Sequence, residues 1–495
     1  MAGDDSTRDP PGHVRYGTVA GRWVIAATVA GSGIAFLDAT VVNVALPAIE
    51  SDLHGGLSGL QWTVDGYLLT LGSLLLLGGS LGDLYGRRRM FVLGLVAFTS
   101  ASALCGLAPS MGTLIAARAL QGAGGALLVP GSLALLSASF APEDRATAVG
   151  AWSGLAGVST ALGPFVGGWL VDAVSWRLVF LINLPLAAAA IAITLRHVPE
   201  SRDLDAVDPP DLTGALLVSG GLGGVVFALI QGPAHGFSPP VVAAAVVGIV
   251  ALVAFPLVER RRRQPLVPLE IFRSRQFSGA NVTTLAVYAA FGGALFLLVL
   301  ELQQVLHYSA TAAGSALLPI TLIMLTLSSR TAKLSQRIGP RLPMTVGPMV
   351  VAAGLVLLSR LRPGDTYVSG VLGGVVVVGL GLALTVPPLT AAVMGAVDER
   401  HMGVGSGVNN ALARIGTLLS VALLPLAGAL TDLSPADPAY RNGISRALLL
   451  SAGLCVIGGL VAFVTVRRAA VVGPLTQPSL SHACGDPCML DEHVA

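Results

Sequence analysis

Charged residues are scarce in this chain. Aspartate, glutamate, lysine and arginine make up 11% of its 495 residues, whereas roughly 25% is usual for a soluble protein. Lysine is nearly absent, because Lys333 is the only one and it stands between Ala332 and Leu334. A phosphate-binding loop needs a lysine in the pattern GK[ST]. The chain therefore lacks the loop by which a primary pump binds ATP.

Cysteine is equally sparse, and it indicates no disulfide framework. Cys105 and Cys455 fall in apolar segments, and Cys484 and Cys488 fall in the tail. The tail stretch SHACGDPC (481–488) has residue types that bind metals but no recognised spacing. We therefore expect a disordered tail and no metal site.

Two further absences narrow the class of protein. No apolar segment carries a mid-helix cluster of histidine with aspartate or serine, so a membrane-embedded enzyme is not indicated. The tail of about 28 residues after Val466 is too short for the signalling domain of a receptor.

Apolar residues are abundant instead. They form 54% of the chain, and the mean hydropathy is +0.77, which indicates a protein that crosses a membrane many times. Runs of about 17 to 25 apolar residues predict fourteen transmembrane helices. These are expected at 23–47, 61–82, 90–108, 113–136, 146–170, 177–195, 211–231, 240–258, 278–302, 311–330, 343–359, 368–390, 404–430 and 444–466.

An even number of helices places both termini on one side of the membrane. Most arginines then fall on the face that bears the termini, including Arg87 to Arg89 and Arg260 to Arg263. The opposite face receives only Arg177, Arg360, Arg362, Arg441 and Arg446. Because positive charge favours cytoplasmic loops, both termini are predicted to be cytoplasmic. The polar start of the chain is unlike a cleavable signal peptide, so the first helix is expected to remain as an anchor.

Internal repetition predicts two related halves. GDLYGRRRMFVLG (82–94) is matched by SQRIGPRLPMTVG (335–347), and RATAVGAWSG (145–154) by RHMGVGSGVNN (400–410). Two six-helix halves with an extra pair of helices between them explain this spacing. The predicted divisions are a cytoplasmic tail (1–22), a first bundle (23–197), the extra pair (211–258), a second bundle (278–466) and a tail (467–495).

One predicted helix contains the stretch STALGPFVGG (159–168). Pro164 removes a backbone donor and kinks a helix, while Gly163, Gly167 and Gly168 let a neighbouring backbone approach closely. A helix that only faces lipid needs none of these residues. We interpret the stretch as a hinge or tight seam between moving helices, with a purely structural packing site as the alternative.

The loop after the second predicted helix carries Gly79, Asp83, Gly86, Arg87 and Arg88. Asp83 lies where it can pair with a basic loop residue or with the positive end of another helix. Such a pair can hold the cytoplasmic side closed and release it when the halves rock. The alternative is a positively charged anchor with a tight turn.

Arg118, in LIAARALQGAGGALL (114–128), lies within an apolar segment, where an unpaired charge is costly. We expect it to face the interior and to pair with Asp38 of LDATVVNVALPAI (37–49), and proton coupling needs a buried carboxylate of this kind. Asp65, in QWTVDGYLL (61–69), is the second choice and Glu301 a third. Three alternatives stay open: Arg118 could extend to the outer surface, Asp38 could form a fixed pair that never titrates, and Glu301 could face water.

Several polar residues in apolar segments are candidates to line a cavity, although asparagine and glutamine also serve to join helices. Arg414 is in addition a candidate gate residue. The candidates are Asn43, Gln61, Gln121, Asn409, Asn410 and Arg414.

Four stretches, LDATVVNVALP, GDLYGRRR, RALQGAGGA and GPFVGG, together resemble the signatures of the fourteen-helix drug:proton antiporter branch of the major facilitator superfamily. The resemblance implies an all-α polytopic membrane fold, with two pseudo-symmetric six-helix bundles and two extra central helices. It implies export of drugs, antiseptics or antibiotic-like amphipathic compounds across the cytoplasmic membrane by alternating access. No enzyme activity and no cofactor are expected, because the proton gradient supplies the energy.

The expected partners are small amphipathic molecules, with lipophilic cations as one candidate class, together with protons and membrane lipid. We expect a monomer that binds no nucleic acid. A dedicated exporter of a single natural product is an alternative within the same branch. A proton-coupled nutrient symporter would share the fold and the loop at 79–88 but not the GPxxGG stretch.

Overall fold

The computed structural model describes residues 14–202, 210–262, 265–398, 401–431 and 433–467. In these residues, fourteen helical spans are long and apolar enough to cross a membrane, which confirms the predicted number. The spans are α1 (Val19–Leu53), α2 (Gly56–Tyr85), α3 (Arg87–Gly106), α4 (Met111–Ser139), α5 (Pro142–Ala173), α6 with α7 (Leu178–Leu181, Asn183–His197), α8 (Leu212–His235), α9 (Pro239–Glu259), α10 with η2 (Arg275–Leu300, Glu301–Val305), α11 with α12 (Ala310–Ala316, Leu318–Ile338), α13 (Arg341–Leu358), η3 with α14 (Tyr367–Val371, Leu372–Met394), α15 (Met402–Ala427) and α16 (Pro438–Thr465).

Most helices extend beyond the predicted apolar runs, because polar residues cap their ends outside the hydrocarbon. The Thr18 hydroxyl accepts a hydrogen bond from the Gly21 amide at the start of α1. The Asp437 carboxylate caps α16, which begins at Pro438, six residues before the predicted start. Hydropathy marks only the apolar part of each helix, so it gives the number of spans better than their ends.

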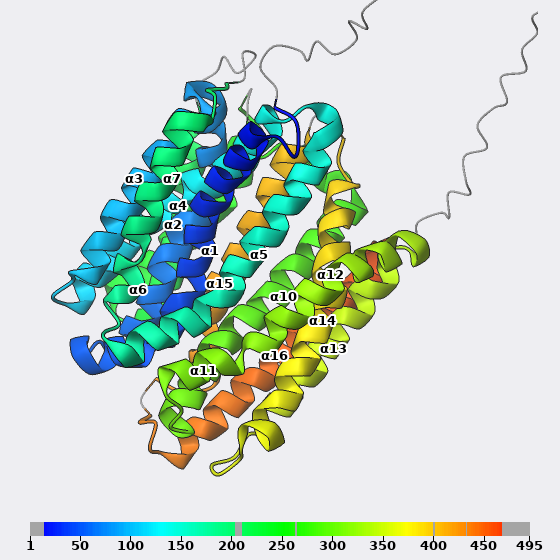
Figure 1. Ribbon diagram of the computed structural model, residues 1–495. Coiled ribbons are helices and arrows are strands. Elements are labelled where there is room, and N and C mark those ends of the chain that lie inside the picture. The colour runs from blue at the N-terminus through cyan, green and yellow to red at the C-terminus, as the bar shows by residue number, and fades with distance from the viewer. Residues whose placement is uncertain (1–13, 203–209, 263–264, 399–400, 432, 468–495) are drawn as a thin grey trace, which may run out of the picture.

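The two halves of the chain repeat one packing pattern, which confirms the predicted fold class. In the first half (α1–α7), α1 packs against α5 and α7, and α4 packs against α2 and α3. In the second half (α10–α16), α10 packs against α15 and α16, and α14 packs against α12 and α13. Figure 1 shows the halves as two tilted groups of helices. The exact domain boundaries given above stay predictions, and nearly all of the predicted C-terminal tail lies outside the described residues.

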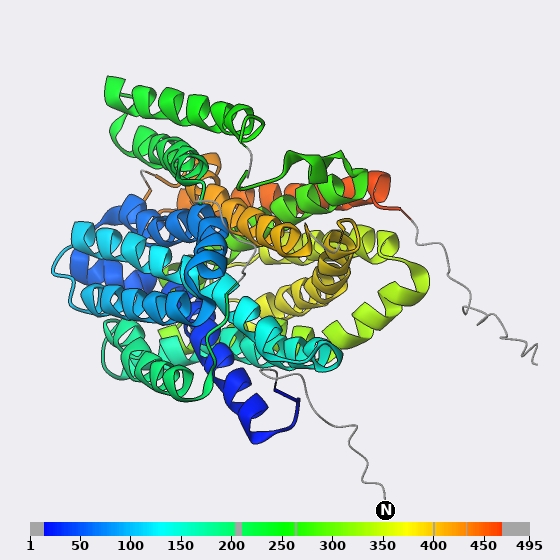
Figure 2. The same ribbon diagram turned by 90° about the horizontal axis from the view of Figure 1, so that it is seen from above.

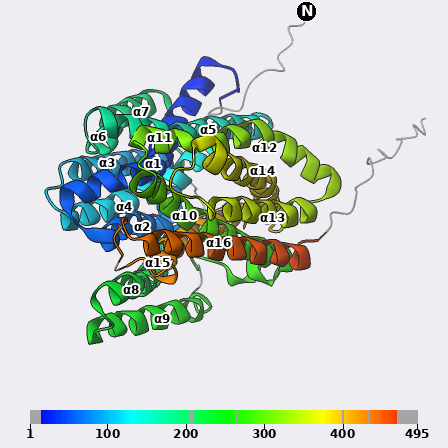
Figure 3. The same cartoon turned by 90° about the horizontal axis from the view of Figure 1, so that it is seen from below.

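The extra pair α8–α9 stands beside the two halves (Figure 2). α9 packs on α8, and α8 packs on α2 of the first half and α15 of the second. Seen from below, the pair lies next to α15, away from the α5–α12 side (Figure 3). The Ser219 hydroxyl on α8 is 2.9 Å from the Ser73 hydroxyl on α2.

We call the face where α1 begins and α16 ends the terminal face, and the other the opposite face. In the described part of the chain, hydrogen bonds join the two halves at three places, and all three lie toward the opposite face. Gln61 on α2 donates to Val421 O on α15 at 2.8 Å. Gln303 on η2 donates to Val44 O on α1 at 2.9 Å. Asp172 on α5 accepts from the backbone of α11. The halves are therefore closed at the opposite face.

Candidate functional site

Asp38 and Arg118 form a buried ion pair inside the first half. The Arg118 Nη1 atom is 2.5 Å from Asp38 Oδ2, and the side chains of Arg118 and Asp38 are 1% and 0% exposed. The Arg118 guanidinium also lies 4.3 Å from the ring centroid of Tyr67, which adds a cation–π contact. The alternative that Arg118 extends to the outer surface is wrong, because the pair, the ring and the Thr63 carbonyl satisfy the guanidinium in the interior.

A polar network surrounds the pair. Gln121 accepts from Arg118 at 2.7 Å and donates to Asp38 Oδ1 at 2.8 Å. Asn183 donates to the same oxygen at 3.1 Å and to Ser102 at 3.0 Å. The Ser102 hydroxyl in turn donates to Phe180 O. Asp38 therefore joins α1 to α4 and α7, and the network reaches α3 through Ser102.

Sequence reasoning missed Asn183 and Ser102. Asn183 is the first residue of α7, directly after the break at Ile182 that separates α7 from α6. Its only sequence signal is a lone asparagine in an apolar run. Gln121 was predicted to line a cavity, but it is fully buried beside Asp38. Whether it contacts a transported molecule stays a prediction.

The other two carboxylate candidates lie apart from this network. Asp65 on α2 is fully buried, and neither of its carboxylate oxygens has a hydrogen-bond partner within the described residues. Glu301 is the first residue of η2 and is 3% exposed. The alternative that Glu301 faces water is therefore wrong, because η2 packs against α10, α11 and α16.

The GPxxGG stretch lies between α1 and α11. A side chain at Gly163 would collide with the Thr40 hydroxyl of α1, and one at Gly167 would stand 3.1 Å from Val41 O. On the other side, Gly168 abuts Ala310 O of α11, and Pro164 O abuts Gly314. One pair of contacts lies within the first half, whereas the other joins the two halves. This geometry is a seam, while the hinge role stays a prediction.

Helix α5 continues through Pro164 without a break. Proline has no N–H, so the carbonyl four residues earlier loses its helical partner. That carbonyl belongs to Thr160, and the Thr40 hydroxyl of α1 lies 3.4 Å from it as a replacement donor. The same hydroxyl lies 3.0 Å from Leu37 O of α1, so α1 and the carbonyl that the proline leaves without a helical partner share this donor.

The α2–α3 loop is held within the first half. Asp83 pairs with Arg87 of its own loop at 2.8 Å, and Gly86 makes the turn with a φ of 108°, which favours glycine. The carboxylate of Glu200, which follows α7, accepts from the backbone amides of Arg88 and Arg89. A carboxylate at a helix N-terminus is favourable.

Gly79 of the same motif lies within α2, where an added side chain would meet Pro130 at 3.6 Å. Among the described residues, no ion pair or hydrogen bond joins the α2–α3 loop to the second half while the opposite face is closed, so the latch stays a prediction.

The remaining cavity candidates have different surroundings. Asn409 on α15 donates to Thr284 on α10 at 2.6 Å, so it joins two helices of the second half. Asn43 donates to Ala39 O of its own helix. Arg414 lies against Gly72 of α2, and its Nε atom has no hydrogen-bond partner within the described residues. Asn410 is half-buried on α15.

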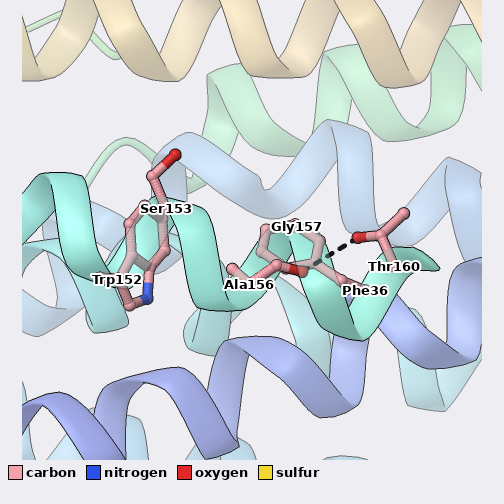
Figure 4. A pocket seen from close by; sticks show the side chains of 6 residues that line it. All are labelled: Phe36, Trp152, Ser153, Ala156, Gly157 and Thr160. Carbon is pink, nitrogen blue, oxygen red and sulfur yellow. Dashed lines mark hydrogen bonds between the residues drawn. The ribbon is translucent and has the colours of Figure 1, made fainter. Parts of the chain in front are cut away.

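A pocket of about 200 Å³ lies between α1 and α5. Figure 4 shows its lining side chains, five from one stretch of α5 and Phe36 from α1. They are Phe36, Trp152, Ser153, Ala156, Gly157 and Thr160. None of these described lining residues is charged.

The comparisons with known proteins agree with this geometry. Residues 28–421 match the model of the Major Facilitator Superfamily. The chain belongs to the major facilitator superfamily. It is 36% identical over 448 residues to the multidrug resistance protein Stp of Mycobacterium tuberculosis, with 88% of this chain and 83% of the relative covered. It is 34% identical over 444 residues to the tetracenomycin C resistance and export protein of Streptomyces glaucescens, with 88% and 82% covered.

A solved structure of the peptide transporter POT matches with a TM-score of 0.65 and 16% identity, covering 92% of this chain and 96% of that one. This likeness shows the fold alone. Members of the major facilitator superfamily are membrane transporters, so the expectation that the chain is not an enzyme is confirmed. The chain is a multi-pass membrane protein of this superfamily, and small molecules are its class of substrate.

Proposed function

We propose that this transporter exports small amphipathic compounds across the cytoplasmic membrane in exchange for protons, by alternating access. The observation that carries the proposal is the buried Asp38–Arg118 pair, which joins the helices of the first half at one carboxylate. The curated relatives support export, because their names describe multidrug resistance and antibiotic export.

The chemistry follows from the charge on Asp38. A proton on Asp38 cancels the negative charge that holds Arg118, and the donors Gln121 and Asn183 lose their anionic acceptor. Hydrogen bonds to charged groups are stronger than neutral ones, so protonation loosens the contacts among α1, α4 and α7. Because α1 also contacts the seam on α5, the change reaches the junction of the two halves.

The orientation follows from the arginines. The terminal face carries Arg87 to Arg89 and Arg260 to Arg262, whereas few arginines lie at the opposite face. We place the terminal face in the cytoplasm on this ground, with the protein in the cell membrane as a monomer in contact with lipid. The proton gradient is the energy source, and no cofactor takes part.

The test uses inverted membrane vesicles with an acidic interior. For an exporter, an added compound accumulates in the lumen while protons leave it, and vesicles without the protein show neither change. A panel of lipophilic cations and uncharged antibiotics covers the substrate classes. Response to a single compound indicates a dedicated exporter, whereas release of a preloaded nutrient together with protons indicates a symporter.

Variants connect the transport to the ion pair. Asp38→Asn is expected to abolish coupled transport while folded protein remains in the membrane. Asp52→Asn is the matched control, because Asp52 lies on the same helix with a half-exposed side chain that pairs with Arg177. Normal coupled export by Asp38→Asn contradicts the assignment.

A further inference from the structure

Two aromatic side chains line the pocket between α1 and α5, and a hydrogen bond orients one of them. Trp152 donates from its indole Nε1 to the Ser32 hydroxyl of α1 at 2.9 Å. That bond occupies the only polar atom of the indole, so the ring offers its apolar face. Phe36 supplies a second ring from α1, and both rings are half-buried.

Small residues line the pocket beside these rings. Ala156 and Gly157 lie on the stretch of α5 between Trp152 and Thr160 (Figure 4). A side chain added at Gly157 would meet only Leu325 of α12, at 3.5 Å. A flat group therefore has room along this stretch of α5, with the second half opposite it.

The described lining of the pocket contains no free negative charge. Asp38 is the nearest acid along α1, but it is fully buried and paired with Arg118. Two residues correspond to about 200° around an α-helix, so Phe36 and Asp38 lie on opposite sides of α1. Hydroxyl groups are the polar groups of the wall, and Thr160 already donates to Ala156 O at 3.2 Å.

We propose that this pocket binds a planar aromatic ring system by its faces, at Phe36 and Trp152, and that no positive charge on the ligand is required. The inference rests on the proposed function only in that the ligand is an exported compound. It names planar aromatic compounds as the substrate class of the site. It thereby differs from the expectation that lipophilic cations are preferred. It also gives α1 two roles, because this helix contacts the ligand on one side and carries the ion pair on the other.

The test measures binding to the purified full-length protein in lipid nanodiscs. Acridone is a planar, uncharged fluorophore, and N-methylacridinium has the same ring system with a positive charge. Fluorescence anisotropy gives the Kd of each. We expect saturable binding of both probes to the wild-type protein, because the rings and not the charge are recognised.

Two substitutions test the aromatic lining of the pocket and its empty volume. Trp152→Ala removes one ring, and Gly157→Leu fills the space beside it. Each is expected to raise the Kd of both probes by about tenfold, the scale of a lost aromatic contact. Trp152→Phe keeps a ring and is expected to keep most of the binding, which separates loss of the ring from loss of the fold.

Matched controls come from the same helix. Trp169→Ala removes an indole that is 56% exposed on α5. Gly154→Leu adds a side chain where nothing lies within 4 Å. Both are expected to leave each Kd within about twofold. The proposal is overturned by absence of saturable acridone binding, by unchanged affinities in Trp152→Ala and Gly157→Leu, or by a Trp152→Ala variant that weakens binding of N-methylacridinium but not of acridone, which would show that the indole recognises the charge.

The outcome is separable from that of the export proposal. Ring-dependent binding without any proton-coupled transport in vesicles supports the pocket and contradicts export. If coupled export is observed but the Kd of acridone is unchanged in Trp152→Ala and Gly157→Leu, the result supports export and contradicts the pocket.

Discussion

The Asp172 carboxylate, at the end of α5, accepts a hydrogen bond from the Thr311 backbone amide of α11 at 2.8 Å. It also accepts from the Ala310 amide at 3.1 Å. Asp172 belongs to the first half, whereas the first turn of α11 belongs to the second. One carboxylate therefore caps a helix of the other half, directly beside the contact of Gly168 with Ala310.

We expect Asp172→Ala to weaken closure at the opposite face, because a helix cap contributes about 0.5–2 kcal/mol. Spin labels at exposed Ser51 and Arg362 report the distance between the halves at this face, once the native cysteines are replaced. The population with the longer distance is expected to rise by about tenfold, and by less in Asp172→Asn, which keeps an oxygen acceptor. Asp437→Ala removes a cap within the second half and should leave the distances unchanged. Equal distance distributions in Asp172→Ala and wild type would refute the role.

The buried ion pair predicts strong coupling between two substitutions. Loss of one partner of a buried pair leaves an uncompensated charge and costs about 3–5 kcal/mol. Arg118→Gln and Asp38→Asn should each lower the melting temperature, and the double variant should lose less than the sum of the two. Thermal unfolding of the wild type, the two single variants and the double variant in detergent gives the melting temperatures of this double-mutant cycle. Additive losses would mean that the pair contributes no coupling.

Gly163→Leu is expected to reduce transport by more than tenfold. The added side chain collides with Thr40 of α1, so α5 cannot keep its place in the seam. Gly154→Leu, at an open position of the same helix, should transport normally. The measurement is coupled export in vesicles, normalised to the amount of folded protein. Undiminished transport by Gly163→Leu would remove support for a moving seam.

The Thr40–Thr160 contact predicts a rescue. Thr40→Val removes the hydroxyl donor of the half-buried Thr160 carbonyl, so we expect a loss of stability below the about 1–3 kcal/mol of a fully buried polar group. Pro164→Ala restores the backbone N–H that this carbonyl lacks. The double variant should therefore melt at a higher temperature than Thr40→Val alone. No recovery in the double variant would show that Thr40 acts through its bonds to its own helix.

The spans could be predicted from the sequence because hydrocarbon imposes a minimum apolar length on every helix. The meeting of Asp38 with Arg118 could be predicted because an isolated charge is costly in an apolar interior. The partners Asn183 and Ser102 could not, since a single asparagine or serine in an apolar helix also occurs where helices are merely joined.

Hydrogen bonds from side chains to the backbone also could not be predicted from the sequence. Gln61 was expected to line a cavity, but it donates to the Val421 and Ala422 carbonyls. Every residue carries a carbonyl, so the residue types do not indicate which one accepts. The role of Glu200 could not be predicted for the same reason, because its carboxylate accepts hydrogen bonds from the backbone amides of Arg88 and Arg89.

The extra pair α8–α9 makes the two junctions between the halves unequal. α8 packs against α2 and α15, so it covers the α2–α15 junction on its outer side. Within the described residues, no helix pair covers the α5–α11 junction in this way, and Leu162, Phe165 and Trp169 of α5 are exposed beside it. A compound dissolved in the bilayer would therefore meet α8 in front of the α2–α15 junction, whereas at the α5–α11 junction it would meet the exposed side chains of α5. The pocket at Trp152 lies on α5, the helix of the exposed junction.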